Sequence, residues 1–298
     1  MKAFDDFISS HGGLCPELPL LHSTKLGNLG GIVKSGKLSL THCAHFGRPL
    51  VYLFYGRPAY RPKAGGDRPD ADFSICPVSF IFKPARLSGR ITRAFPHDTG
   101  AALNGLFAPG IGPAQGLDYE IQANARSLQR YVSRVFLSNE KYFVGEPDPA
   151  LKTLNVDDAV RRFLDLIEPA GATPVDDRRY TAELQLEEDI SLRDLLLAVV
   201  LPRAFMDREA IRNAIVNYWG AIPLMYDTYA GGIPQAYYQT VKQKVLDFYR
   251  EHRLLLAPTS KPRYSVASAI PPAAFRPLWC RSGRREAAFS CILIAPSP

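Results

Sequence analysis

The sequence contains no long apolar segment. None of its 298 residues lies in a stretch close to the roughly 20 uninterrupted apolar residues that a membrane-spanning helix requires. The N-terminus carries Asp5 and Asp6 where a signal peptide has its apolar segment. Together these absences predict a cytoplasmic protein that makes no membrane contact.

Cysteine is scarce and follows neither a disulfide nor a metal pattern. The chain has 5 cysteines, an odd number, and no secretory signal accompanies them, which favours reduced thiols. His42, Cys43 and His45 lie close together, with Cys15 and Cys76 elsewhere in the chain. However, there is no Cys-x-x-Cys pair and no second pair at zinc-finger spacing. We interpret these side chains as ordinary loop or strand residues and expect no metal site.

The composition is that of a globular protein. Hydrophobic residues make up 46% and charged residues 22% of the chain, which excludes collagen, a coiled coil and a wholly disordered protein. At roughly 100–200 residues per domain, the length allows one large domain or two small ones.

Positive charge is concentrated at the C-terminal end. Residues 253–298 hold seven basic side chains and one acid, and so contribute +6 of the net charge of +7, while residues 1–252 are left with +1. The tail is also rich in proline and shows little periodicity. We therefore predict a domain over residues 1–252 and a basic extension over 253–298, which is either solvated or in contact with phosphates or an anionic partner.

Hydrophobic periodicity predicts a mixture of helices and strands. Helices are expected over residues 3–9, 25–35 with a stop at Gly36, 117–136, 156–167, 207–219 and 235–252. Strands are expected over residues 20–21, 51–55, 75–82, 180–186 and 195–201.

Three segments carry side chains suited to chemistry. The first is His22-Ser23-Thr24 at the end of a short apolar strand, followed by Asn28-Leu29 and a helix with a glycine stop. The second is the aromatic strand 51–55, which leads into the segment 56–61 with its two arginines. The third is Glu183 in a strand that reads Tyr-Thr-Ala-Glu-Leu-Gln-Leu. Each has an ordinary structural explanation by itself, but their order along the chain is more specific.

This order resembles the ADP-ribosyltransferase fold, and in particular the DarT-type toxins that modify single-stranded DNA. In that family an apolar strand runs into His/Arg-x-Thr, Asn-Leu follows four residues after the threonine, and a helix then ends at glycine. The tyrosine-rich strand and its Arg-Pro continuation are similar to the family's next strand, and Ala182-Glu183 is similar to the late strand that carries the catalytic glutamate. The resemblance covers three segments within roughly residues 20–215 and leaves residues 84–175 and the tail unaccounted for.

The resemblance implies an α+β fold, an ADP-ribosyltransferase-like split β-sandwich decorated by helices. It implies transfer of ADP-ribose from NAD to a macromolecule, with nucleic acid (single-stranded DNA or RNA) preferred over protein. It also implies a toxin or anti-phage role and a neutralising antitoxin protein. The implied catalytic residues are Glu183 and Arg57. The implied NAD-binding residues are His22, Ser23, Thr24, Asn28, Arg48, Tyr55, Tyr60 and Arg61.

The chemistry supports these residue types independently. Cleavage of the nicotinamide–ribose bond creates an oxocarbenium-like sugar, which a carboxylate stabilises while it accepts the acceptor's proton. Glu183 suits that role. The pyrophosphate of NAD requires cationic donors, and its amide and hydroxyl groups require small polar partners in a cleft. The chain has no G-x-G-x-x-G motif after a strand, which argues against a Rossmann site but not against a cleft of this kind.

Several alternatives remain open at this point. Arg48, Arg57 and Arg61 are rival candidates for the pyrophosphate. Glu187, in a Gln-x-Glu pair, is a rival to Glu183. The chain also fits a non-catalytic relative that binds nucleic acid or protein, or a hydrolase that uses Cys43 with a histidine.

Overall fold

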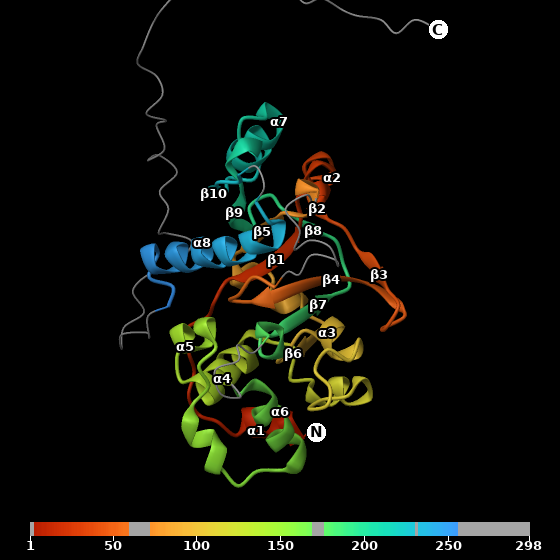
Figure 1. Cartoon of the computed structure of the whole chain (residues 1–298), viewed down its shortest axis with the longest axis vertical. Helices are drawn as coiled ribbons and strands as arrows, with labels where there is room; N and C mark the ends of the chain where they lie inside the picture. The colour runs from red at the N-terminus through yellow and green to blue at the C-terminus, as the bar shows by residue number, and fades with distance from the viewer. Residues whose placement is uncertain (1–2, 60–71, 169–175, 230–231, 256–298) are drawn as a thin grey trace, which may run out of the picture. The chain divides into compact units, whose positions relative to one another are not determined.

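The computed structural model describes residues 3–59, 72–168, 176–229 and 232–255 (Figure 1). The chain divides into a unit of residues 1–258 and a unit of residues 259–298. The second unit, and with it nearly all of the predicted basic extension, lies outside the described residues.

Eight strands in the described part form one mixed sheet, in the order β10-β9-β5-β1-β4-β7-β6, with β3 paired to β4. Neighbours are antiparallel except β9 and β10, which are parallel. The strands are β1 (Leu20–Lys25), β3 (Thr41–Cys43), β4 (Arg48–Tyr55), β5 (Pro77–Phe82), β6 (Arg93–Phe95), β7 (Glu183–Leu186), β9 (Leu196–Pro202) and β10 (Ile222–Tyr226). A separate short pair joins β2 (Lys37–Leu38) to β8 (Ile190–Ser191).

Helices cover this sheet. They are α1 (Ala3–Ser9), α2 (Leu29–Ser35), α3 (Thr99–Leu103), α4 (Ala125–Phe136), α5 (Asn139–Val144), α6 (Asp158–Ile167), α7 (Glu209–Arg212), the π-helix η9 (Asn213–Tyr218) and α8 (Tyr237–Glu251). The 3-10 turns are η1 (Leu26–Asn28), η2 (Phe73–Ile75), η3 (Pro84–Arg86), η4 (Ser88–Arg90), η5 (Pro113–Tyr119), η6 (Pro149–Thr153), η7 (Asp177–Arg179), η8 (Arg203–Phe205) and η10 (Pro234–Ala236). The mixed architecture agrees with the predicted α+β class.

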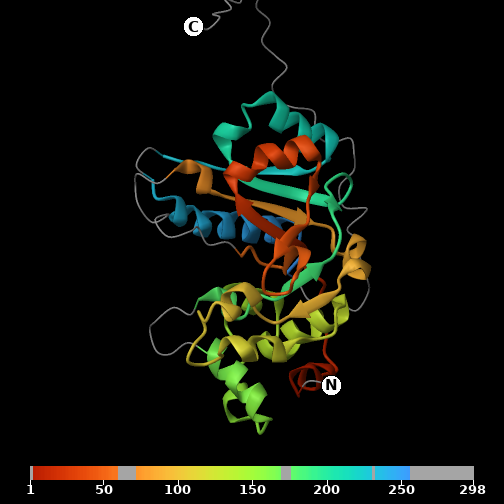
Figure 2. The same cartoon turned by 90° about the vertical axis from the view of Figure 1, so that its right-hand side faces the viewer.

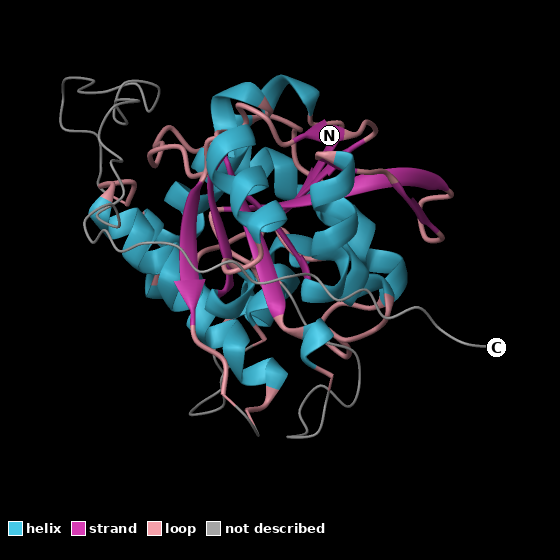
Figure 3. Cartoon of the chain, turned by 90° about the horizontal axis from the view of Figure 1, so that it is seen from above, coloured by secondary structure: helices cyan, strands magenta, loops and turns pink. Residues whose placement is uncertain are grey.

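Two groups of helices lie at different ends of the sheet. α8 packs on β5, β9 and β10, and α2 contacts α7 beside them (Figure 2). α1, α4, α5 and α6 gather beyond β6 and β7, in the lower half of Figure 1. Seen from above, helices lie on both sides of the strands (Figure 3). β5 and β9 are buried along their whole length, as expected for apolar strands covered on both faces.

The sheet opens between β1 and β4. These strands pair only at Leu20–Tyr55 and Leu21–Phe54, whereas β1 stays paired with β5 as far as Lys25. On the other side of the opening, β4 stays paired with β7. Residues of β1 from His22 onward therefore face β4 across a gap without backbone ladder hydrogen bonds.

Most expected elements are confirmed, and the exceptions have local causes. The helix expected over 117–136 is wrong in its first part, because Ile121 forms a bridge to Ala94 and interrupts it. The helix restarts at α4, where the Asn124 side chain accepts a hydrogen bond from the Ser127 amide. Gly36 ends α2 in the left-handed conformation, with φ of 67°, as its glycine stop predicts.

Among the described residues, no helix combines the length and apolar character needed to cross a membrane.

Candidate functional site

A cleft of about 610 Å³ occupies the opening between β1 and β4. Its volume falls in the range of roughly 300–1,000 Å³ that is typical of small-molecule sites. The lining comes from β1, η1, α2, β2, β3 and β4. The lining residues are His22, Thr24, Gly27, Asn28, Gly31, Ile32, Ser35, Lys37, Leu38, Ser39, Thr41, Leu50, Val51 and Tyr52.

His22 closes the inner end of this opening. Its Nδ1 donates a hydrogen bond of 2.9 Å to the Tyr52 carbonyl on β4, where the ladder is missing. Because Nδ1 carries the proton in this bond, Nε2 is left as an acceptor. Burial lowers the pKa of His22, although the bond to Tyr52 opposes this shift, and the ring is therefore neutral at physiological pH.

Thr24 and Asn28 form a second polar group on the same wall. The Asn28 amide donates to the Thr24 hydroxyl at 2.8 Å, so the turn η1 is tied to the end of β1. Both residues line the cleft. The structure therefore places three of the predicted site residues, His22, Thr24 and Asn28, in the lining of one cavity.

Glu183 lies at the start of β7, where it is 1% exposed. Its Oε2 accepts from the Thr99 amide at 3.0 Å, and its Oε1 accepts from the Thr99 hydroxyl at 2.5 Å. The Gln185 amide donates to Oε1 at 2.9 Å. Three donors thus hold the carboxyl group in one orientation.

Burial raises the pKa of Glu183 to about 8, and the negative charge of Asp98 adds to this shift. The hydrogen bonds from Thr99 and Gln185 act in the opposite direction because they favour the ionised form. At pH 7 the carboxyl group is therefore mostly protonated. A buried carboxyl with a pKa near neutrality is characteristic of functional sites.

Tyr52 connects Glu183 to the cleft. In the antiparallel pairing, Tyr52 stands opposite Gln185 and Phe54 stands opposite Glu183, so all four side chains project from the same face. Tyr52 also lines the cleft. Burial raises its pKa, and a hydrogen bond with Cys43 and the charge of Glu183 raise it further. The phenol is therefore a neutral donor beside the glutamate.

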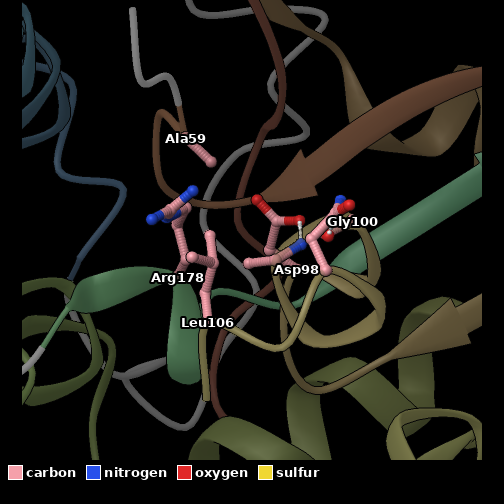
Figure 4. Close-up of a pocket in the computed structure, with 7 residues that line it drawn as sticks. Ala59, Asp98, Gly100, Leu106 and Arg178 are labelled. Atoms are coloured by element: carbon pink, nitrogen blue, oxygen red, sulfur yellow. Dashed lines mark hydrogen bonds between the residues drawn. The ribbon is translucent and has the colours of Figure 1, made fainter. Parts of the chain in front are cut away.

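A second cavity, of about 320 Å³, lies on the α3 side of Glu183. Figure 4 shows Asp98, Arg178 and Leu106 in its wall. Asp98 caps α3 by accepting from the Ala101 amide at 2.8 Å, and it directly precedes Thr99. Glu183 is thus linked to the cleft through Tyr52 and to this cavity through Thr99 and Asp98.

Other predicted site residues lie away from the cleft lining. The Ser23 hydroxyl bonds to the Ser79 hydroxyl at 2.7 Å. The Tyr55 side chain is fully buried, and its hydroxyl accepts from the Leu18 amide at 3.0 Å. The structure places both in the packing of the sheet.

Arg57 is completely buried in an ionic cluster beyond the end of β4. It donates to the Tyr142 carbonyl at 2.5 Å, to Asp177 at 3.2 Å and to the Tyr180 hydroxyl at 3.3 Å. Its guanidinium also lies 4.4 Å from the centre of the Tyr180 ring. Lys242 of α8 completes the cluster through Asp177. These contacts describe an interior cation that joins four segments of the chain.

Arg48 and Glu187 form an exposed ion pair at 2.8 Å. Neither residue lines the cleft. Glu187, the rival to Glu183, is therefore on the surface of the sheet. Tyr60 and Arg61 lie outside the described residues.

The described cysteines and histidines do not gather into a metal site. No group of three or more metal-ligating side chains occurs in the described part of the chain. Within that part, no hydrogen bond joins Cys43 to His22 or His45, the pairs that a thiol hydrolase would need.

Sequence reasoning missed Tyr52, Thr99 and Asp98 as site residues. Asp98 followed by Thr-Gly-Ala-Ala is a helix-start signal, and it could have identified the cap. Nothing in the sequence shows that this cap lies against Glu183, because 84 residues separate Thr99 from it. That contact is created by the pairing of β6 with β7.

Comparisons with protein-family models, with curated proteins and with solved structures found no match to this chain.

Proposed function

We propose that this protein is an NAD-dependent ADP-ribosyltransferase that uses the cleft between β1 and β4 for NAD and Glu183 as its catalytic carboxylate. The observation that carries the proposal is one arrangement. A buried carboxyl group, held by Thr99 and Gln185, lies on β7, the strand that pairs with β4, and Tyr52 of β4 lines the polar opening that also contains His22 and Thr24. The opening also supports the split β-sandwich that the resemblance implies.

The cleft offers partners of the right kind for NAD. The free Nε2 of His22 is an acceptor for the carboxamide N–H of nicotinamide, and Thr24 and Asn28 supply small polar groups for ribose hydroxyls. Lys37 is the cation in the lining, and it is paired with Asp189 at 2.5 Å. A pyrophosphate would compete with Asp189 for this ammonium group. Neither Arg48 nor Arg57 is among the lining residues.

The reaction requires the ionised form of Glu183. The nicotinamide–ribose bond breaks, nicotinamide leaves with the bonding electron pair, and the ribose carbon becomes cationic. The acceptor atom then forms a bond to that carbon, and its proton passes to the Glu183 carboxylate. Because the pKa of Glu183 is about 8, only a minority of the free protein is active at pH 7, and the positive charge of bound NAD's nicotinamide favours ionisation.

The acceptor in this proposal is single-stranded DNA or RNA, and protein is the second candidate. The resemblance to DarT-type toxins and the basic tail support nucleic acid. A transferase of this kind harms its own cell, so we also propose a toxin or anti-phage role and a neutralising protein partner.

The test is to incubate the full chain with NAD labelled in its adenylate part together with single-stranded DNA, RNA or a cell lysate. Digestion of the product with nuclease or protease then identifies the acceptor. We expect label on nucleic acid for the wild type and none for Glu183→Gln. Label that only protease removes would identify protein as the acceptor. The absence of label from every sample would contradict the proposal that this protein is an ADP-ribosyltransferase.

A non-catalytic binding module is the second candidate. It is favoured by the burial of Glu183, which is 1% exposed, and by the absence of arginine from the lining of the cleft. Calorimetry separates the two candidates, because a binding module would retain ligand in the cleft without consuming it.

A further inference from the structure

The outer face of α4 carries three arginines in register. Arg126, Arg130 and Arg134 are four residues apart, which places them about 6 Å apart along one side of the helix. The opposite side is buried through Leu128, Val132 and their neighbours. The helix contains no acidic residue, so its side chains carry +3. In Figure 1 this helix lies in the lower half of the molecule, beside α5. We call these three residues the α4 arginine row.

The row has no counter-charge within the described residues. No carboxylate there pairs with any of the three guanidinium groups, whereas Arg48, Arg93 and Arg203 each hold a glutamate or aspartate. The Nε atoms of Arg130 and Arg134 are buried and have no hydrogen-bond partner in the described part of the chain. Within the described residues, these two donors of the row are therefore unpaired.

Helix stability does not explain the row. Arg126 is in the first turn of α4, where the helix dipole disfavours a cation. Like charges at a spacing of four residues repel each other, and the row contains two such pairs. His11, which bonds to Ser133 on the same face, has a pKa lowered by burial and then by Arg134 and Arg130. The neutral histidine adds no further repulsion.

Packing holds part of the row in place. The Arg134 guanidinium lies 4.6 Å from the centre of the Phe7 ring of α1. Arg130 and Arg134 are half-buried, while Arg126 is exposed. A row that is partly fixed loses less side-chain entropy when it binds a ligand than free surface arginines do.

We infer that the α4 arginine row is a docking surface for the phosphate backbone of a nucleic acid. A linear row of unpaired guanidinium groups matches a linear polyanion, since arginine binds phosphate through two parallel N–H donors. A protein partner is disfavoured because protein interfaces concentrate binding energy in apolar and aromatic anchors. The outer face of α4 instead carries the arginines with Gln129 and Ser133. This inference deepens the proposed function by naming a second contact for its acceptor.

The experiment measures binding of the full chain to labelled single-stranded oligonucleotides over a range of salt concentrations, without NAD. The triple variant R126Q/R130Q/R134Q removes the row. The matched control R86Q/K141Q/K244Q removes the same charge from three cations on other elements that also have no ion pair within the described residues. A third variant, R126K/R130K/R134K, keeps the charge and tests for loss of packing.

Three phosphate contacts on a single strand contribute about 2 to the slope of log affinity against log salt. We expect R126Q/R130Q/R134Q to lose that amount of slope, and up to roughly 100-fold in affinity at 0.1 M salt, while the control stays close to wild type and the lysine variant keeps the wild-type slope. Equal losses of slope and affinity in the row variant and the control would overturn the inference, because the net charge of the protein would then explain its binding to nucleic acid. An unchanged slope in the row variant would overturn it as well. Since NAD is absent, the result does not depend on transferase activity.

Discussion

Thr99 donates to both oxygens of Glu183, through its amide at 3.0 Å and through its hydroxyl at 2.5 Å. The two residues belong to segments that are far apart in the sequence and meet where β6 pairs with β7. In the proposed enzyme, Thr99 is a positioning residue, because it fixes the direction of the carboxyl group and favours its ionised form.

The first prediction follows from the contact with Thr99. Thr99→Val removes the hydroxyl donor but keeps the shape of the side chain and the amide. Because that hydrogen bond lowers the pKa of Glu183, its loss should raise the pKa further. NAD cleavage should then fall at pH 7 and recover toward pH 9, as measured by nicotinamide release.

Thr99→Ser is the matched control, since it retains the hydroxyl and should keep the wild-type pH profile. A lower rate in Thr99→Val without a shift of the profile would mean that Thr99 acts only through packing.

The second prediction concerns stability and does not depend on enzyme activity. The pKa of Glu183 is about 8 in the folded protein and 4.5 in its unperturbed state. Between these values the folded state keeps a proton that the unfolded state has lost, so stability falls as pH rises, by up to about 1.4 kcal/mol per pH unit. Glu183→Gln cannot titrate and should lack this contribution.

The measurement is the free energy of unfolding in denaturant from pH 5 to pH 8.5 for both proteins. The difference in stability between Glu183→Gln and wild type should move in favour of the variant as pH rises. A difference that stays constant with pH would show that Glu183 is ionised in the folded protein at neutral pH.

The third prediction tests the wall of the cleft. His22→Ala removes the acceptor Nε2 and should weaken NAD binding by about 1–3 kcal/mol, or roughly 5- to 150-fold, in calorimetry. Ser23→Ala is the matched control, because the Ser23 hydroxyl bonds to Ser79 and does not line the cleft. Equal affinities in His22→Ala and wild type would remove His22 from the site.

The fourth prediction separates a structural arginine from a catalytic one. Arg57→Met removes the cation of a buried pair and leaves Asp177 with Lys242, which should cost about 3–5 kcal/mol of stability. Arg48→Gln breaks an exposed ion pair and should cost less than about 1 kcal/mol. At a temperature where Arg57→Met is folded, its affinity for NAD should match that of the wild type. A loss of NAD affinity in the folded variant would show that Arg57 belongs to the NAD site.

The sequence predicted the cleft side of the site better than the glutamate side. His22, Thr24 and Asn28 lie within seven residues of each other, so one strand and one turn are enough to bring them together. The direction of Ser23 also follows from the alternation of a strand, which sends it to the face opposite its neighbours.

The partners of Glu183 depend on distant pairing and were not predictable. Thr99 reaches it only because β6 lies at the edge of the sheet beside β7. Arg48 and Arg57, the arginine candidates within the described residues, do not line the cleft for a similar reason. Arg57 follows β4 into the interior, where Asp177 neutralises its charge and the Tyr180 ring stacks on its guanidinium group. Neither contact has a local signal in the sequence.

The central claim is that Glu183 performs chemistry on NAD in its ionised form. The most direct measurement is nicotinamide release from NAD, in the presence of single-stranded DNA and then RNA, at pH 6 to pH 9.5 for wild type and Glu183→Gln. We predict a wild-type rate that rises with pH through about 8, and a variant that still binds NAD but is slower by about 100-fold or more at every pH. A variant within threefold of wild type, or a wild type that releases no nicotinamide with either acceptor, would contradict the claim.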